Sequence, residues 1–413
     1  MDSLRSIMTT AFHYLTCAVA VSLGLANPGI AQDSLVIADV TVIDATGAAP
    51  RPNSTVVLAG GRIVVIGDGR TPIPRRSRVV RAPGKFLIPG LWDMHTHLRE
   101  NQLAMLVAHG VTGVRDMGNI LSDVDRWRAE TATGARVAPR IFRVGPVLNG
   151  QSFGPAHVAI TNAAEARVAA RVLKHVGVDA LKTHRALSRD AYFALTDEAK
   201  RLGIRVVGHI PQTVTAAEAS DAGQASFEHT ETLFEGQEPL KQEEASELFA
   251  RFVKNGNAYT PTLVAYRGST EPANIDSALL RKYPDIVSGR RKLFGQFVTL
   301  VGLMNKAGVV LMTGSDLGAR WISPGSALHE ELALFVEAGL TPMEALQAAT
   351  RNPARFLGIP AGTVEPSMLA DLILLDANPL EDIRNSRRIH AVVLDGRYFE
   401  KAELDRLGAQ VAP

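Results

Sequence analysis

Residues 87–97 read LIPGLWDMHTH, an apolar run that ends in two histidines separated by one residue. Successive side chains of a strand point to opposite faces, so His95 and His97 lie on one face, where their imidazoles can share a metal ion. A His-x-His pair alone is weak evidence, because such pairs also arise by chance. The run predicts a buried strand whose carboxyl end binds a metal.

The same kind of run recurs along the chain, separated by stretches of helical period. That period is clearest at Ala163–Val176, Asp190–Leu202 and Ala327–Ala338. Eight strand–helix units over about 270 residues predict an α/β protein built as a (β/α)8 TIM barrel. The eight runs are Leu87–His97, Val111–Gly118, Arg140–Leu148, Ala180–His184, Arg205–Ile210, Ser226–Thr230, Ala258–Val264 and Val309–Asp316.

Five of these runs have residues of the type that binds metals at or directly before their carboxyl end. The residues are His97, Lys182 with His184, His209, His229 and Asp316. Packing does not explain why apolar strands should end so consistently in histidine, lysine or aspartate. In a barrel, catalytic groups come from the carboxyl ends of different strands, so we expect these side chains to meet at one face.

Lys182 has two interpretations. By composition the default is an exposed lysine at a strand tip. A desolvated lysine, in contrast, has a lowered pKa and can react with carbon dioxide to form a carbamate. A carbamate offers two oxygens and could bridge two cations at the roughly 3.5–4 Å separation of binuclear sites.

His209, His229 and Asp316 also have alternative interpretations. Each histidine alone would more often be a hydrogen-bonded core residue, but at successive strand ends the two plausibly hold a second cation. Asp316 could be a helix N-cap. It could equally bind the first metal and take a proton from bound water, whose pKa a metal lowers from 15.7 to about 7. The N-cap interpretation leaves the other five residues unexplained.

The two ends of the chain look like short strands. Val56–Leu58 and Ile63–Ile66 flank Gly60-Gly61, which is a hairpin signal, and the tail has further runs at Ala370–Asp376 and Ala391–Gly396. We expect a small β-sandwich-like domain from residues 32–86 plus 360–413, with the barrel at 87–359.

Residues 1–31 resemble a signal peptide. Arg5 forms the basic region, residues 15–26 are an apolar stretch too short to span a bilayer, and Gly29 and Ala31 precede the expected cleavage site. We therefore expect export to the periplasm or beyond, with no stable membrane insertion; a retained amino-terminal anchor is the alternative. Cleavage would remove Cys17, the single cysteine, so a metal site must use histidine and oxygen ligands.

The charge balance argues against a nucleic-acid partner. Lys plus Arg is 44 and Asp plus Glu is 42, a net charge of +2. The sequence shows no basic run with interleaved aromatic residues. We expect a small-molecule substrate and no nucleic acid, and the sequence leaves a homo-oligomer open.

These motifs together resemble the amidohydrolase superfamily, in particular its imidazolonepropionase-like and prolidase-like (Xaa-Pro dipeptidase) branch of metal-dependent hydrolases. The resemblance covers nearly the whole chain after residue 31. The matching pieces are Leu87–His97, Gly110–Thr112, Val114–Asp116, Gly208-His209, Glu228-His229, Thr313–Asp316, Leu328–Leu332, Ala338–Pro342, Ala349–Ala354, Ala370–Leu372 and Asn378–Leu380.

The resemblance implies roles for the six residues. His95 and His97 would bind a buried metal, Lys182 as a carbamate would bridge, and His209 with His229 would bind an exposed metal. Asp316 would be both ligand and proton shuttle. Two divalent ions, zinc first and cobalt, manganese or iron as alternatives, would hold a bridging hydroxide that hydrolyses amide or ester bonds. Without carboxylation of Lys182, a one-metal site remains possible.

Substrate recognition is expected from loops after the strands. Tyr266, Arg267 and Arg185 could bind a substrate carboxylate, although each more often is a solvated surface residue. His157 could reach the scissile carbonyl. His329, at the start of a predicted helix, fits a structural hydrogen bond equally well. His184, two residues after Lys182, could compete as a metal ligand or stack in the pocket, and the sequence leaves its role open.

Three functions compete on this basis. The first is a binuclear amidohydrolase that cleaves a dipeptide or an N-acyl amino acid, and the second is a hydrolase of cyclic amides or lactones with the same metal core. The third is a catalytically inactive barrel scaffold, which the presence of all six ligand positions disfavours.

Overall fold

The computed structural model describes residues 34–233 and 242–409. The predicted signal peptide, with Cys17 and the cleavage site after Ala31, lies outside the described residues. Within them, no helix is long and apolar enough to cross a membrane.

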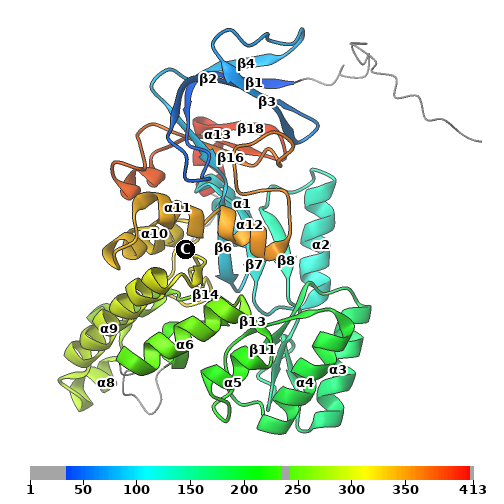
Figure 1. Cartoon of the computed structure of the whole chain (residues 1–413), viewed down its shortest axis with the longest axis vertical. Helices are drawn as coiled ribbons and strands as arrows, with labels where there is room; N and C mark the ends of the chain where they lie inside the picture. Colours follow the sequence, from blue (N-terminus) through cyan, green and yellow to red (C-terminus); the bar gives the residue numbers. More distant parts are fainter. Residues whose placement is uncertain (1–33, 234–241, 410–413) are drawn as a thin grey trace, which may run out of the picture.

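Eight parallel strands form a closed barrel, which lies below the sheet formed by the chain ends in the view of Figure 1. Two hydrogen-bonded sheets make up the ring, and backbone bonds join them at both seams: Asp179 N donates to Arg143 O (2.8 Å) and Asp316 N donates to His95 O (2.9 Å). The (β/α)8 prediction is confirmed. The barrel strands are β6 (Leu91–Thr96), β7 (Val111–Asp116), β8 (Arg140–Arg143), β11 (Ala180–Thr183), β12 (Arg205–Gly208), β13 (Gln224–Glu228), β14 (Ala258–Thr260) and β15 (Val310–Leu311).

The third predicted run is interrupted. It contains β8 and the short β9 (Val147–Asn149), which pairs with β11 and with β10 (His157–Ala159). Gly145 takes a left-handed φ of 73° between the two strands and Pro146 follows it. Proline has no N–H for a ladder, so the strand breaks here.

Helices surround the barrel and match the three predicted helical stretches within one residue at each end. Local capping explains the starts of two of them, because Asn162 and Ser188 accept hydrogen bonds from the first-turn amides of α3 and α4. The outer helices are α1 (Leu103–Ala108), α2 (Leu121–Ala132), α3 (Ala163–His175), α4 (Arg189–Leu202), α5 (Ala216–Asp221), α6 (Gln242–Asn255), α9 (Ile286–Ala307) and α10 (Ser326–Glu337).

Further helices lie between or after these elements. Two of them, α7 and α8, sit between β14 and α9, and α7 follows the barrel mouth directly. They are α7 (Leu263–Ser269), α8 (Ser277–Lys282), α11 (Pro342–Ala348), α12 (Arg351–Leu357), α13 (Lys401–Gly408) and the 3-10 helix η5 (Ile383–Arg387).

A second sheet combines both ends of the described chain, seen as the blue and red strands that lie together in Figure 1. Its order is β18-β17-β16-β5-β1-β2-β3, with β4 paired to β1, and it encloses an apolar core separate from that of the barrel. The Gly60-Gly61 hairpin joins β2 and β3 as predicted. The strands are β1 (Leu35–Val42), β2 (Arg51–Ala59), β3 (Arg62–Asp68), β4 (Arg78–Arg81), β5 (Phe86–Pro89), β16 (Leu372–Leu375), β17 (Ile389–Leu394) and β18 (Arg397–Glu400).

The first predicted run, Leu87–His97, is two strands rather than one. β5 belongs to the second sheet and β6 to the barrel, and the chain passes between them at Gly90. A Cβ at Gly90 would lie 2.1 Å from Thr112 Oγ1, so only glycine fits there. The exact domain boundaries stay a prediction.

Candidate metal centre

The six predicted ligands gather at the carboxyl-terminal mouth of the barrel. Ligand atoms of His95, His229 and Asp316 all lie within 4.8 Å of one another. Asp316 Oδ1 is 3.6 Å from His95 Nε2 and 3.8 Å from His97 Nε2. The aspartate therefore faces both histidines of the His95-Thr96-His97 motif.

Lys182 and His209 complete the group. Lys182 is only 1% exposed, and its Nζ lies 3.4 Å from His95 Nε2. The His209 ring lies 4.5 Å from the ring of His229, centroid to centroid. The buried Lys182 excludes the default interpretation of a solvated lysine at a strand tip.

The hydrogen bonds determine which imidazole nitrogen faces the centre. Nδ1 of His95 donates to Glu228 Oε2 (3.0 Å), Nδ1 of His97 to Gly118 O (3.4 Å) and Nδ1 of His229 to Thr262 Oγ1 (2.8 Å). A neutral imidazole has one donor and one acceptor nitrogen, so each of these rings turns an unprotonated Nε2 toward the cluster. Such outer hydrogen bonds are typical of metal-binding histidines.

His209 offers a different nitrogen. Its Nδ1 is buried and has no hydrogen-bond partner among the described residues. An unpaired buried polar atom is costly, and a cation would satisfy it. Four imidazoles, a lysine and a carboxylate around one space are a donor set that fits divalent transition metals.

The low polarity of the mouth keeps these histidines neutral. Burial lowers the pKa of His97 to about 4 and that of His229 to about 3, and it holds the pKa of His95 and of His209 well below the usual value. Burial also lowers the pKa of Lys182 to about 8. The four histidines are therefore unprotonated at neutral pH, which is the form that binds metals.

A buried ion pair behind His95 was missed by the sequence reasoning. Arg115 Nη2 donates to Glu228 Oε1 (2.7 Å), and Glu228 Oε2 accepts the proton of His95 Nδ1 (3.0 Å). The sequence signal that could have identified Glu228 was its position directly before His229. Successive residues of a strand point to opposite faces, so the pattern did not predict that both side chains belong to one site.

The backbone conformation at His229 explains how Glu228 and His229 can both belong to one site. His229, Thr262 and Asp316 follow β13, β14 and β15, and all three have left-handed φ values of 67°, 52° and 56°. This conformation is strained for residues other than glycine and is enriched at functional sites. At His229 this backbone accompanies a ring that lies 4.4 Å from the ring of His95, centroid to centroid.

The substrate-binding candidates Tyr266, Arg185 and His157 lie around this mouth. The Tyr266 ring is 6.4 Å from the ring of His229. Arg185 pairs with Glu231, and its charge contributes to lowering the pKa of His229. Burial first and then Lys182 lower the pKa of His157. Their role in substrate binding stays a prediction.

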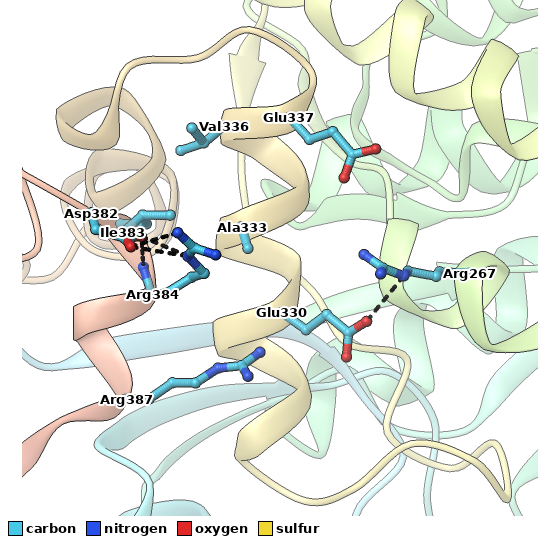
Figure 2. Close-up of a pocket in the computed structure, with 9 residues that line it drawn as sticks. All are labelled: Arg267, Glu330, Ala333, Val336, Glu337, Asp382, Ile383, Arg384 and Arg387. Atoms are coloured by element: carbon cyan, nitrogen blue, oxygen red, sulfur yellow. Dashed lines mark hydrogen bonds and ion pairs between the residues drawn. The ribbon is translucent and has the colours of Figure 1, made fainter.

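Arg267 and His329 do not join the cluster. Figure 2 shows Arg267 directed toward Glu330 (3.4 Å) in a groove of about 540 Å³ between α7, α10 and η5, which none of the six ligands lines. His329 is buried, with Nδ1 bonded to Ser386 Oγ and Nε2 to His109 O, both at 2.9 Å. Both ring nitrogens of His329 are thus occupied in structural bonds, and Arg267 lies in a groove that the six ligands do not line. A role in substrate binding stays a prediction for both residues.

His184 lies beside the ligands. Its ring is 4.4 Å from that of His209, and its buried Nδ1 has no partner among the described residues. Burial lowers its pKa to about 4. The ring contact with His209 is the stacking arrangement, one of the two roles that the sequence left open for His184.

The chain matches the amidohydrolase family over residues 86–398 and belongs to that family, whose members are metal-dependent hydrolases acting on carbon–nitrogen bonds. Among solved structures, a putative prolidase from Bifidobacterium longum is similar with a TM-score of 0.76 and 26% identity, over 91% of this chain and 98% of that one. A Xaa-Pro dipeptidase with bound methionine shares the fold, with a TM-score of 0.73 and 22% identity over 89% of this chain and all (100%) of that one.

Among curated sequences, an uncharacterized protein of Mycobacterium bovis is 27% identical over 212 residues, which are 51% of this chain and 52% of the relative. The chain thus spans about half the length of the first curated relatives it matches.

Proposed function

We propose that this protein is a binuclear metal-dependent amidohydrolase that cleaves the amide bond of a dipeptide or an N-acyl amino acid. The observation that carries the proposal is the convergence of six donor side chains at one barrel mouth, with unprotonated Nε2 atoms of three histidines facing one space. The likeness to a putative prolidase supports the dipeptidase specificity.

In this proposal, His95 and His97 would hold one cation, and His209 and His229 would hold the other. Lys182 would be a further ligand in its carbamate form, for which its burial next to His95 Nε2 is favourable. Zinc suits these nitrogen and oxygen donors, although cobalt, manganese and iron are compatible. When bound, two such ions supply an activated water at neutral pH and polarise the scissile carbonyl.

Asp316 moves the proton. Its Oδ1 lies between His95 and His97 (3.6 and 3.8 Å), where it can take a proton from the attacking water and pass it to the leaving nitrogen. Tyr266, Arg185 and His157 surround the same mouth and orient the substrate carboxylate and carbonyl. The chain is exported in this proposal, because residues 1–31 resemble a signal peptide.

The test uses residues 32–413 loaded with zinc in the presence of bicarbonate. A panel of Xaa-Pro and other dipeptides, N-acyl amino acids, cyclic amides and lactones is assayed together with the zinc content per chain. The Asp316→Asn variant should lose on the order of 10²–10⁴-fold in kcat on the active class. The control is Asp190→Asn, an exposed aspartate on α4, which should behave as the wild type.

The outcomes separate the alternatives. Turnover of dipeptides or N-acyl amino acids that depends on Asp316 supports the proposal, whereas turnover of cyclic amides or lactones alone favours the second function. Wild-type protein that binds no metal would refute the six-ligand centre and favour an inactive scaffold. Zinc content that falls from two to one when bicarbonate is withheld would support the carbamate on Lys182.

A further inference from the structure

Thr262 precedes helix α7 as its N-cap residue but does not cap the helix. A threonine at this position ordinarily has extended backbone and accepts a hydrogen bond from a first-turn amide. Here Thr262 has a left-handed φ of 52° and makes no side-chain cap hydrogen bond. Its hydroxyl donates instead to Pro261 O (2.8 Å) and accepts from His229 Nδ1 (2.8 Å).

The capping is done by a residue from another helix. Glu331 of α10 is buried, and its Oε1 and Oε2 accept from the amides of Leu263 (3.0 Å) and Val264 (2.7 Å). These are the first two amides of α7, which have no acceptor inside the helix. Burial raises the pKa of Glu331 to about 8, and the two amide hydrogen bonds act in the opposite direction because they favour the carboxylate, as the helix dipole also does.

We propose that Glu331 is a positioning residue of the metal centre: it caps α7 in place of Thr262, and this frees the Thr262 hydroxyl to hold His229. The Thr262 proton is committed to Pro261 O, so the hydroxyl can only accept from His229. The proton of His229 therefore stays on Nδ1, and Nε2 stays available to a cation. The inference rests on the proposed function only in assigning His229 as a ligand.

The capping of α7 by Glu331 also positions Tyr266, a second residue at the barrel mouth. Tyr266 lies on α7 one turn after Leu263, and its ring packs against His229 and Phe297. Because Glu331 holds the first turn of α7, it orients the ligand His229 and the substrate-binding candidate Tyr266 together. The hydrogen bonds of Glu331 go to the amides of Leu263 and Val264, so its effect on the two rings is transmitted through α7.

The experiment compares four variants of the zinc-loaded protein. Thr262→Val keeps the branched shape and the backbone strain but removes the hydroxyl, whereas Thr262→Ser keeps the hydroxyl. Glu331→Gln keeps one acceptor oxygen and turns the other into a donor that faces an amide. His329→Gln is the matched control, since His329 is a buried neighbour on α10 whose bonds go to Ser386 and His109.

Zinc affinity is measured by competition with a chelator, and stability by thermal unfolding. Thr262→Val and Glu331→Gln should bind the more weakly held zinc about 10–100-fold less tightly, while Thr262→Ser should bind like the wild type. His329→Gln should lower the melting temperature and leave zinc affinity unchanged. The inference is overturned if Thr262→Val keeps full affinity, or if Glu331→Gln loses stability alone.

A second measurement does not depend on metal. The ¹⁵N imidazole shifts of metal-free protein report the tautomer of His229, assigned by comparison with His229→Gln. We expect the Nδ1–H form in the wild type and a mixture in Thr262→Val. If the wild type binds no zinc, the proposed function is refuted, and the tautomer measurement can still be made. If the wild type binds two zinc ions and Thr262→Val keeps the same tautomer, only this inference is refuted.

Discussion

At the scale of single residues, Arg115 is a charged side chain that is buried completely in the protein. It is a fully buried guanidinium that donates to Met94 O (2.7 Å), Ser226 Oγ (2.8 Å) and Glu228 Oε1 (2.7 Å). Its contacts reach the barrel strands β6 and β13 from β7. A buried ion pair is tolerated only when such bonds satisfy both charges, and here the pair also holds the acceptor of His95.

Removal of Arg115 alone should strongly lower the free energy of unfolding. Arg115→Met removes the guanidinium that pairs with the buried Glu228 carboxylate, which we expect to cost about 3–5 kcal/mol of unfolding free energy. Denaturant unfolding of the single variants and of Arg115→Met with Glu228→Gln measures this. The double variant should be more stable than the sum of the two single effects implies, because no uncompensated charge remains. Additive effects would contradict a coupled pair.

Residue-scale features also show why the structure brings some of the sequence candidates together and places others elsewhere. Lys182 and His209 could be recognised from their run ends, since a polar residue that closes an apolar strand points to the barrel mouth. Arg267 could not be judged in this way. It lies on α7 next to Tyr266, and only the helix orientation decides that Tyr266 turns to His229 while Arg267 turns to Glu330.

At the scale of elements, helices α9 and α10 pack so closely that one position excludes a side chain. A Cβ at Gly302, inside α9, would lie 2.2 Å from Ala338 O at the end of α10. Gly295 lies two turns earlier on the same helix with nothing within 4 Å of the equivalent position. α10 carries Glu331, so this contact also supports the helix that caps α7.

Substitution by alanine should change the stability in opposite directions at the two glycines. Gly302→Ala forces the helices apart and should destabilise the protein by about 1–3 kcal/mol. Gly295→Ala meets no obstacle and should gain roughly 0.5–1 kcal/mol, because alanine loses less backbone entropy than glycine in a helix. Urea unfolding of both variants tests the contact, and a stabilising Gly302→Ala would show that α9 and α10 are not closely packed.

At the scale of the whole molecule, polar contacts tie the barrel to the sheet and segments formed by the chain ends. Arg140, in β8, donates to both oxygens of the buried Asp371 (2.6 and 3.2 Å), directly before β16. On another side, His329 of α10 bonds to Ser386 in η5 and to His109 O before β7. These contacts join segments more than 50 residues apart in the sequence.

His329 makes this docking sensitive to pH. Burial lowers the pKa of His329 from 6.5 to about 3. Between these two pH values the unfolded chain binds a proton at His329 and the folded protein does not. Stability from this residue is complete above pH 6.5 and falls as the pH drops toward 3. At pH 7.5, His329→Gln should be less stable than the wild type, and the difference should shrink by about 1.4 kcal/mol at pH 5.5.

Denaturant unfolding of both zinc-saturated proteins at the two pH values measures this change. The metal ligands are the same in the two proteins, so their own titration cancels in the difference. A constant difference between pH 7.5 and 5.5 would show that His329 is not held neutral by burial.

The sequence by itself determined the barrel, the two-ended sheet and the positions of the candidate ligands. Period-two and period-3.6 patterns are local, and a residue that ends a buried strand must lie at an end of the barrel. Tertiary structure alone decided the rest: the division of the run Leu87–His97 at Gly90, the Arg115–Glu228 pair, and the capping of α7 by Glu331. These depend on side chains and amides brought together from distant segments and on backbone angles that have no periodic signature.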